Sequence, residues 1–273
     1  MSRQTETLLM NALIIVVALL TVFPLVWMLS VSFMTPGDAA VFPPPLWPKN
    51  ATFENYVELF ARGGMGRYVF NSFLISTCAT LLALTFNVTA GYAFAKMRFF
   101  GRDAVFGILL GALIIPAQVG MMPLFLMLKS MGVINTYAGA LVPWIASVFG
   151  IFLVRQFALS IPDEMIEAAR VDGASEFRIF RSIVMPVLQP VLVTVALFTF
   201  LTSWNDFMWP LIVLTGEQNY TLPVALAALS REHVQDNEMM MAGAVVTTIP
   251  VLLLFLVLQR FYIQGMLSGS VKG

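Results

Sequence analysis

Long apolar runs dominate this sequence and limit what it can fold into more than any other feature does. About six stretches of roughly 18 or more predominantly apolar residues follow one another, and each is long enough to cross a bilayer as a helix. Charged residues make up only 11% of the 273 residues, whereas a soluble domain carries about 25%. The sequence therefore predicts an all-α polytopic membrane protein with six transmembrane helices in a single domain, 1–273.

The apolar runs also set the boundaries of the expected spans. These cover about 8–30, 68–95, 104–128, 137–157, 185–214 and 241–261. The first run is too long for the apolar part of a secretory signal and has no small-residue cleavage site behind it, so we expect a span there. Prolines inside the spans predict kinks that serve either packing or a hinge for alternating access. They are Pro116, Pro123, Pro143 and Pro250.

The distribution of Lys and Arg predicts the orientation, because loops on the cytoplasmic side carry an excess of these residues. Placing the N-terminus in the cytoplasm puts ten of the 15 basic residues inside. These are Arg3, Lys96, Arg98, Arg102, Arg155, Arg170, Arg178, Arg181, Arg260 and Lys272. Both termini and the charged segment 160–183 are then expected in the cytoplasm.

This segment, which we call the elbow (residues 160–183), interrupts the apolar sequence with its densest charge. Ser160 can cap a first helix, with Pro162 in the first turn and acidic residues at the positive end of the helix dipole. Gly173 suits the left-handed position that ends such a helix, and Ser175 can cap a second helix from Glu176 to Ile183. The pattern predicts two short helices that meet at a glycine. An ordinary loop with its charges in water is the alternative.

The elbow carries a recognisable motif. Glu167-Ala168-Ala169 is followed after three residues by Gly173, and then by Ile183-Val184-Met185-Pro186. This stretch resembles the cytoplasmic "EAA" loop of ABC-transporter permeases, with Met185 in place of the usual leucine. Three further stretches resemble the carbohydrate-uptake group of these permeases, in particular the maltose-permease-G-like subunit. They are 204–211, 220–223 and, at the end of the chain, 259–265 together with 269–273.

The resemblance implies the type I fold of ABC importer permeases and a role for the elbow. In that family the elbow docks into a cleft of a cytoplasmic ATPase subunit and transmits its motion. The residues to which the resemblance carries this ATPase-coupling role are Glu167, Ala168, Ala169, Asp172 and Gly173. It also implies that the tail at Val271-Lys272-Gly273 contacts the ATPases.

Features that the sequence lacks point to separate partner subunits. The chain has no G-x-x-x-x-G-K-[ST] phosphate loop, so it cannot bind ATP in that way. We expect a non-catalytic subunit that binds no cofactor, with ATP and Mg on a cytoplasmic ATPase dimer. A homologous second permease subunit, an extracytoplasmic sugar-binding protein, membrane lipid and a sugar substrate complete the expected partners, and no nucleic acid is expected. The expected location is a bacterial or archaeal cytoplasmic (inner) membrane.

Polar residues near the outer end of the fifth span form a candidate substrate path. An intramembrane carboxylate is costly and therefore suggests function. Asp206 shares a polar stripe with Thr199 and Ser203. Ser203, Trp204, Asn205 and Asp206 have the chemistry that binds sugars. The alternative is that Trp204 and Trp209 anchor the chain at the membrane interface.

Taken together, these features predict the membrane-spanning permease subunit of an ATP-driven, binding-protein-dependent sugar importer. The alternatives are a secondary transporter, or an ABC permease for another solute such as glycerol phosphate. A secondary transporter would need coupling-ion ligands near the membrane midplane, and none is evident. An integral membrane enzyme is disfavoured because the chain has one His, His233, and one Cys, Cys78.

Overall fold

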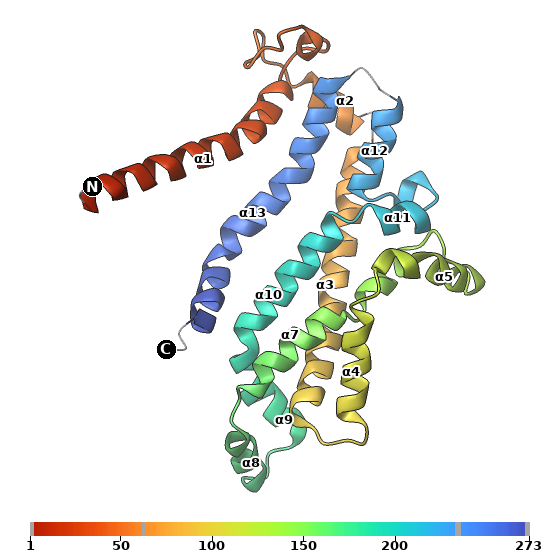
Figure 1. Cartoon of the computed structure of the whole chain (residues 1–273). Helices are drawn as coiled ribbons and strands as arrows, with labels where there is room; N and C mark the ends of the chain where they lie inside the picture. The colour runs from red at the N-terminus through yellow and green to blue at the C-terminus, as the bar shows by residue number, and fades with distance from the viewer. Residues whose placement is uncertain (1–2, 62–63, 233–235, 271–273) are drawn as a thin grey trace. The chain divides into compact units, whose positions relative to one another are not determined.

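The structure is a computed structural model that describes residues 3–61, 64–232 and 236–270, with only the backbone described for residues 3, 231–232 and 258–270. The described part is built from helices and contains no strand (Figure 1). Contacts divide the chain into two compact units, which are described separately. The first comprises Met1–Val69 and Leu222–Leu252, and the second Phe70–Thr221 and Leu253–Gly273.

Four helical segments of the described part are long and apolar enough to cross a membrane as continuous spans. They are Gln4–Val31, Met65–Lys96, Glu176–Trp204 and Asn237–Val257. Two bent helix pairs raise the number to six if each pair forms one span: Arg102–Ala112 with Ala117–Ser130, bent by 102°, and Tyr137–Trp144 with Val148–Leu159, bent by 43°. The larger bend lies where the sequence places Pro116, whose extended backbone (ψ 132°) ends one helix before the next begins.

The first unit packs the loop after the first helix against itself and against the last helix. Its elements are α1 (Arg3–Val31), η1 (Asp38–Ala40), α2 (Glu54–Ala61), the first turn of α3 (Met65–Lys96), α12 (Leu222–Glu232) and the start of α13 (Asn237–Ser270). Asn55 donates from Nδ2 to the carbonyls of Ser32 and Met34, at 3.0 and 2.8 Å. The buried Glu238 accepts from the Ala39 amide at 2.7 Å. These bonds satisfy backbone groups that the loop would otherwise bury without partners.

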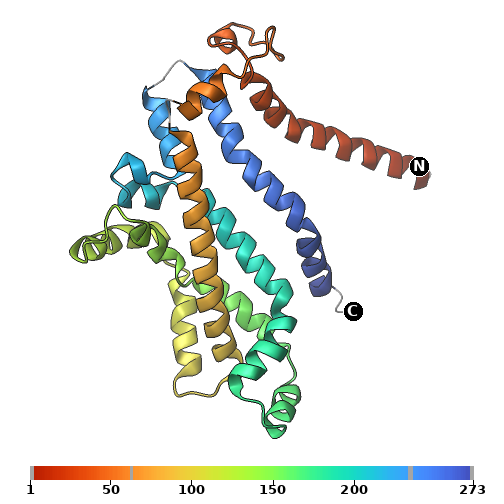
Figure 2. The same ribbon diagram turned by 180° about the vertical axis from the view of Figure 1, so that it is seen from behind.

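The second unit holds the elbow at one end of a helical bundle, as both ribbon views show (Figures 1 and 2). Its elements include α4 (Arg102–Ala112), α5 (Ala117–Ser130), α6 (Tyr137–Leu141), η2 (Val142–Trp144), α7 (Val148–Leu159), α8 (Asp163–Val171), α9 (Glu176–Ile179), η3 (Phe180–Val184), α10 (Met185–Trp204), α11 (Met208–Val213) and η4 (Glu217–Asn219). One buried cluster joins α3, α7, α10 and the elbow. The elbow therefore shares a core with the bundle.

Glycines allow α3 and α7 to approach each other closely within that core. An added Cβ on Gly91 would lie 2.7 Å from Cβ of Val154, and one on Gly150 would lie 2.3 Å from Nδ2 of Asn87. The Asn87 side chain also accepts from the Ser147 amide at 2.9 Å, at the start of α7. Small residues at an interface are the usual way for membrane helices to pack tightly. Asn87 is thus an interhelical hydrogen-bonding residue between α3 and α7.

The helices around the fifth predicted span, 185–214, begin before it and are interrupted within it. At its start, α9, η3 and α10 follow one another without a break, and η3 is a π-helical turn. Pro186 lies just after this turn and cannot donate to the carbonyl four residues earlier, which favours a widened turn there. At its end, α10 stops at Trp204 and α11 begins only at Met208. The intervening Asn205 bonds back to the last turn of α10, because its side chain and its amide both donate to the Leu201 carbonyl, at 2.8 and 3.1 Å.

Candidate functional site

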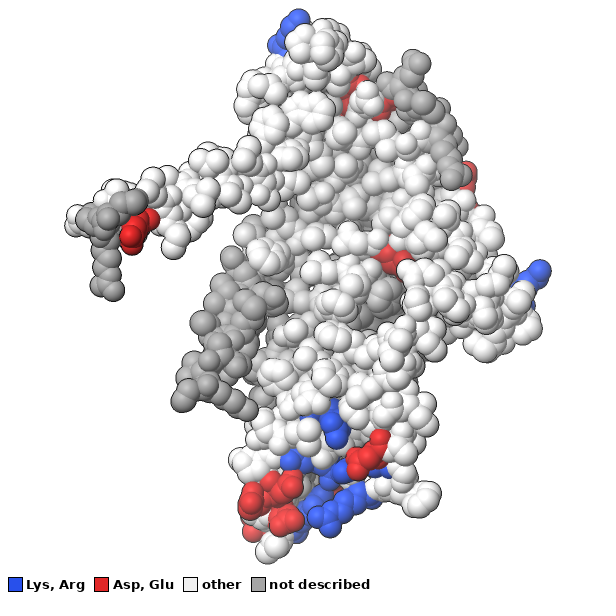
Figure 3. Space-filling view, viewed as in Figure 1, with Lys and Arg blue, Asp and Glu red and all other residues white. Residues whose placement is uncertain are grey.

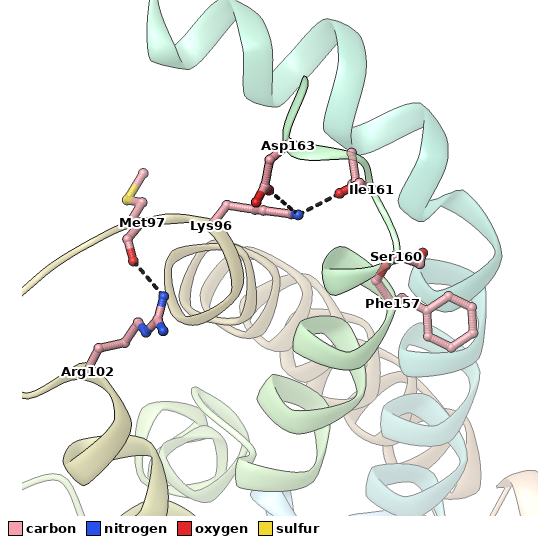
Figure 4. Close-up of polar contacts among 7 residues, drawn as sticks. All are labelled: Lys96, Met97, Arg102, Phe157, Ser160, Ile161 and Asp163. Atoms are coloured by element: carbon pink, nitrogen blue, oxygen red, sulfur yellow. Dashed lines mark hydrogen bonds and ion pairs between the residues drawn. The ribbon is translucent and has the colours of Figure 1, made fainter. Parts of the chain in front are cut away.

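The elbow begins with a helix whose start differs from the prediction. The structure starts α8 at Asp163 with Pro162 in the cap position, held extended at ψ 133°. The prediction that Ser160 caps this helix is wrong, because its Oγ donates back to the Phe157 carbonyl at 2.7 Å (Figure 4). Ser160 thus belongs to the end of α7, and the rigid Pro162 separates it from α8.

The glycine at the corner of the elbow has the predicted geometry. Gly173 has φ 78°, and its amide donates to the Arg170 carbonyl at 3.0 Å while the next amide, of Ala174, donates to the Ala169 carbonyl at 3.0 Å. This pair of bonds is the Schellman motif, which satisfies the last carbonyls of a helix. Ser175 then accepts from the Arg178 amide at 3.3 Å and caps α9, as predicted.

An ion pair closes the corner from outside. Arg170 donates from Nε to Oε1 of Glu176 at 2.6 Å and from Nη2 to Oε2 at 3.2 Å. A two-bond contact between guanidinium and carboxylate fixes orientation better than a single bond does. The two helices of the elbow are therefore held at one angle by the glycine turn and by this pair.

Lys96, the last residue of α3, binds the start of the elbow. Its ammonium donates to the Ile161 carbonyl at 2.5 Å and to Oδ1 of Asp163 at 2.6 Å (Figure 4). The hydrogen bond from Lys96, followed by its charge, lowers the pKa of Asp163 below its ordinary value. In the sequence, Lys96 indicates only the orientation of the chain. No pattern of neighbouring residues marks this contact, since the two residues stand 67 positions apart.

The elbow presents apolar side chains on its outer side. Ile166 and Ile179 are buried in the core shared with the bundle, and Ala169 is half-buried against the same core. Val171 and Phe177, in contrast, are 88% and 71% exposed. The other residues predicted to couple to an ATPase, Glu167, Ala168, Asp172 and Gly173, are exposed as well. The structure thus brings four of the five predicted residues to the surface, in the same elbow as these two exposed apolar side chains.

Charges gather at this end of the second unit, where Figure 3 shows acidic and basic side chains side by side. A hollow of about 790 Å³ opens there between the end of α3, the start of α4 and the elbow. Most of its lining is charged: Lys96, Arg98, Arg102, Asp163, Glu167, Arg170 and Glu176. In the described part of the chain, no three His, Cys, Asp or Glu side chains gather into a metal site. The predicted contact residues Val271–Gly273 lie outside the described residues.

The candidate path residues at and just after the end of α10 differ in exposure. Trp204 is 1% exposed and stacks on Phe200, with ring centroids 5.9 Å apart, and Ser203 is buried beside it. Asn205 is exposed and Asp206 is half-buried. Oδ1 of Asp206 accepts from the Trp209 amide at 3.4 Å, so this carboxylate contacts the first turn of α11.

Both tryptophans of this region are buried, contrary to the anchoring alternative. Trp209 donates from its indole nitrogen to the Gly139 carbonyl at 3.1 Å. Nearby, the buried Asn71 accepts from the Tyr137 hydroxyl at 2.7 Å and donates to the carbonyls of Gln218 and Tyr220. An indole with its nitrogen bonded inside the protein supports packing and does not hold the chain at a lipid headgroup.

Residues 87–267 match the family described as "Binding-protein-dependent transport system inner membrane component". The arabinooligosaccharides transport system permease protein AraQ of Halalkalibacterium halodurans is 36% identical over 100% of both chains. The lactose transport system permease protein LacG of Rhizobium radiobacter is 32% identical over 99% of this chain and 98% of its own. The melibiose/raffinose/stachyose import permease protein MelC of Bacillus subtilis is 34% identical over 84% of each.

A solved structure shares the fold. It is a chain of a bacterial ABC transporter involved in the import of the acidic polysaccharide alginate, with a TM-score of 0.84 at 24% sequence identity. The match covers 96% of this chain and 99% of that one. The predicted fold class, an all-α importer permease, is confirmed by this likeness.

Proposed function

Since the chain belongs to the family of binding-protein-dependent transport system inner membrane components, we propose that it is the membrane-spanning permease subunit of an ATP-driven sugar importer. The names of the relatives support the substrate class, because they include transporters of arabinooligosaccharides, lactose and melibiose. The chain itself is a non-catalytic transport subunit that binds no cofactor.

The observation that carries the proposal is the outer surface of the elbow. Val171 lies outside the candidate spans and Phe177 is the second residue of the segment Glu176–Trp204, and both large apolar side chains are largely exposed. Exposed apolar side chains of this kind are typical of a surface that a partner covers. The sequence has no phosphate loop of its own, so the partner that fits is a cytoplasmic ATPase subunit, with ATP and Mg bound there. Glu167, Ala168 and Gly173 border this surface and take part in the contact, together with Ala169 and Asp172.

The elbow faces the cytoplasm, and so do both termini. The contact between Lys96 and Asp163 supports this orientation, since it brings the basic turn after α3 and the elbow to the same end of the second unit. An excess of Lys and Arg marks the cytoplasmic side of a bacterial or archaeal inner membrane. The loops 31–67 and 215–240 then face an extracytoplasmic sugar-binding protein.

A homologous second permease subunit provides the other half of the transport path. In this chain, the exposed Asn205 and the half-buried Asp206 contact the sugar, while the buried Ser203 and Trp204 shape the wall behind them. Their positions at the end of α10 support this assignment, because the helix is interrupted there and polar groups are left free of the regular helix bonds.

Reconstitution with the second permease subunit and the ATPase tests the proposal. Gly173→Pro removes the amide that bonds to the Arg170 carbonyl and cannot adopt φ 78°, so we expect it to abolish ATP-driven uptake. Glu167→Lys reverses an exposed charge beside the docking surface and is expected to do the same. Glu6→Lys, an equal charge change at an exposed position of α1, is the control and should transport normally. Normal uptake by both elbow variants would show that the elbow does not couple the chain to an ATPase.

A further inference from the structure

Lys96 connects α3 to the elbow although the two are far apart in sequence. Its ammonium lies at the last turn of α3, and its carboxylate partner Asp163 stands 67 residues later, in the first turn of α8. The Lys96 side chain is only 6% exposed, whereas that of Asp163 is 74% exposed. The lysine is therefore a nearly buried cation that reaches out to an acid on the elbow.

Both acceptors of Lys96 belong to the segment that enters the elbow. Ile161 offers its backbone carbonyl at 2.5 Å and Asp163 its carboxylate at 2.6 Å. A buried ammonium without partners is strongly unfavourable, so α3 and the start of α8 cannot separate without a large cost in free energy. Charge-assisted bonds of this length are also among the strongest that a protein makes.

A second contact links α3 to the other side of the elbow. Tyr92, one turn before Lys96, packs its ring against Phe180, with centroids 5.2 Å apart. Phe180 opens the π-helical turn that continues into α10. The end of α3 thus contacts the elbow where it begins and where it joins α10.

The elbow reaches the three neighbouring helices by different routes. The chain itself connects it to α7 through Ser160–Pro162 and to α10 through η3. No such covalent connection joins it to α3, whose end is held by Lys96, by the ring of Tyr92 and by the buried core that Val88 and Ala95 share with the elbow. Any displacement of the elbow therefore moves α7 and α10 directly, but moves α3 only as far as these contacts hold.

We propose that Lys96 is the positioning residue that makes α3 move with the elbow when the ATPase subunits close. This role rests on the proposed function of the elbow as the ATPase contact. Without the lysine, the ATPase still binds and hydrolyses ATP, because the outer surface at Val171 and Phe177 is unchanged. The movement then fails to reach α3, and ATP is consumed with less sugar transported.

The number of sugar molecules transported per ATP hydrolysed, measured in proteoliposomes, tests this role. In Lys96→Met we expect the ATPase subunit to co-purify as in the wild type, while the ratio falls about tenfold. Arg98→Met is the matched control, since it removes an exposed positive charge two residues away and should leave the ratio unchanged. A wild-type ratio in Lys96→Met would overturn the proposal, and so would an equal fall in both variants.

Chemical restoration of the ammonium distinguishes positioning from a general loss of packing. Cys78 is the only cysteine, so Lys96→Cys in a Cys78→Ala background offers a single thiol beside the hollow at the elbow. Alkylation with 2-bromoethylamine, completed before the ATPase is added and verified by mass, rebuilds a lysine-like side chain. We expect this treatment to restore the ratio and methyl methanethiosulfonate, which adds no charge, to leave it low. Restoration by both reagents, or by neither, would contradict the role of the ammonium.

Asp163→Asn carries the test if Lys96→Met does not assemble. Asp163 is exposed, so its substitution should not disturb folding, and it should lower the ratio in the same direction by a smaller factor. An unchanged ratio in Asp163→Asn would then overturn the proposal. The wild-type complex is the reference for both proposals. If it does not take up sugar on ATP hydrolysis, the proposed function fails. Fully coupled transport in the lysine variants refutes only the role of Lys96.

Discussion

The contact between Gly91 and Val154 allows a quantitative test of how α3 and α7 pack. In Gly91→Ala the new Cβ would stand 2.7 Å from both Cβ and Cγ1 of Val154 and 3.0 Å from the Ile151 carbonyl oxygen. Carbon atoms in van der Waals contact lie about 3.5–4.0 Å apart. The Cβ of Val154 and the Ile151 carbonyl belong to the frame of α7 and cannot rotate away, so the two helices must separate by about 1 Å.

Two opposing effects determine the size of the change. Alanine in place of glycine favours a helix by about 1 kcal/mol. Overpacking of a well-packed core costs about 1–3 kcal/mol, and rigid atoms on both sides place this site towards the upper end. We therefore expect Gly91→Ala to be less stable than the wild type by about 1–2 kcal/mol.

Thermal unfolding of the purified protein in detergent, followed by the loss of monodisperse protein, measures this difference. Gly107→Ala, in α4, is the matched control: its added Cβ meets nothing within 4 Å, so only the helix preference acts and the protein should be as stable as the wild type or more so. Val154→Gly removes both clashing carbons and should restore part of the loss in the double variant, beyond the sum of the single effects. If Gly91→Ala gains stability as Gly107→Ala does, then α3 and α7 do not approach each other as described.

Three further predictions concern the elbow and the end of α10. Gly173→Ala should weaken uptake and ATPase co-purification through backbone strain of about 1–2 kcal/mol at φ 78°. A steric clash does not contribute, because the added Cβ meets no atom within 4 Å. Gly173→Asn tolerates this backbone conformation and should retain more uptake and more co-purification. Asp206→Ala should lower thermal stability by about 1 kcal/mol because it removes the acceptor for the Trp209 amide, whereas Asp206→Asn keeps an acceptor and should not. Loss of uptake in both variants would assign the carboxylate to the substrate path. Loss of uptake in Asp206→Ala alone would assign it to helix capping. Because Lys96 lowers the pKa of Asp163, their pairing is complete above the ordinary pKa of 3.8 and is lost only as the pH falls through the lowered pKa. The pH profiles of coupled transport by the wild type and Asp163→Asn should therefore run parallel between about pH 5 and 8. A fall in transport confined to the wild type in that range would contradict this expectation.

Local sequence signals predicted the corner of the elbow well. A glycine that must take a positive φ and a serine three residues before the amide it caps are features of neighbouring residues, and both Gly173 and Ser175 lie as expected. The same reasoning failed at Ser160, because Pro162, expected in the first turn, occupies the cap position. Pro162 is closer to the helix and fixed in an extended conformation.

Apolar length alone could not predict where the spans break. The predicted fifth span continued past Trp204 because the following residues are largely apolar. The structure ends α10 there: the Asn205 side chain bonds back to the Leu201 carbonyl, and Asp206 accepts from the Trp209 amide in the first turn of α11. Similarly, α9 joins α10 through a π-helical turn, which follows from the position of Pro186 and does not alter the hydropathy of the segment.

Contacts between distant segments were beyond the reach of the sequence. Lys96 and Asp163 carry no shared motif, and only the packing of α3 beside the elbow reveals that they meet. The side chains of the elbow fall into two groups, those that attach it to the bundle and those that a partner can cover. The inner side is held by the bonds of Lys96 to Ile161 and Asp163 and by the buried Ile166 and Ile179. The outer side, with Val171 and Phe177, offers apolar area that is stabilised only when a partner covers it. An element built in this way stays attached to its bundle while its partner moves, which is the mechanical requirement for transmitting that movement to α3.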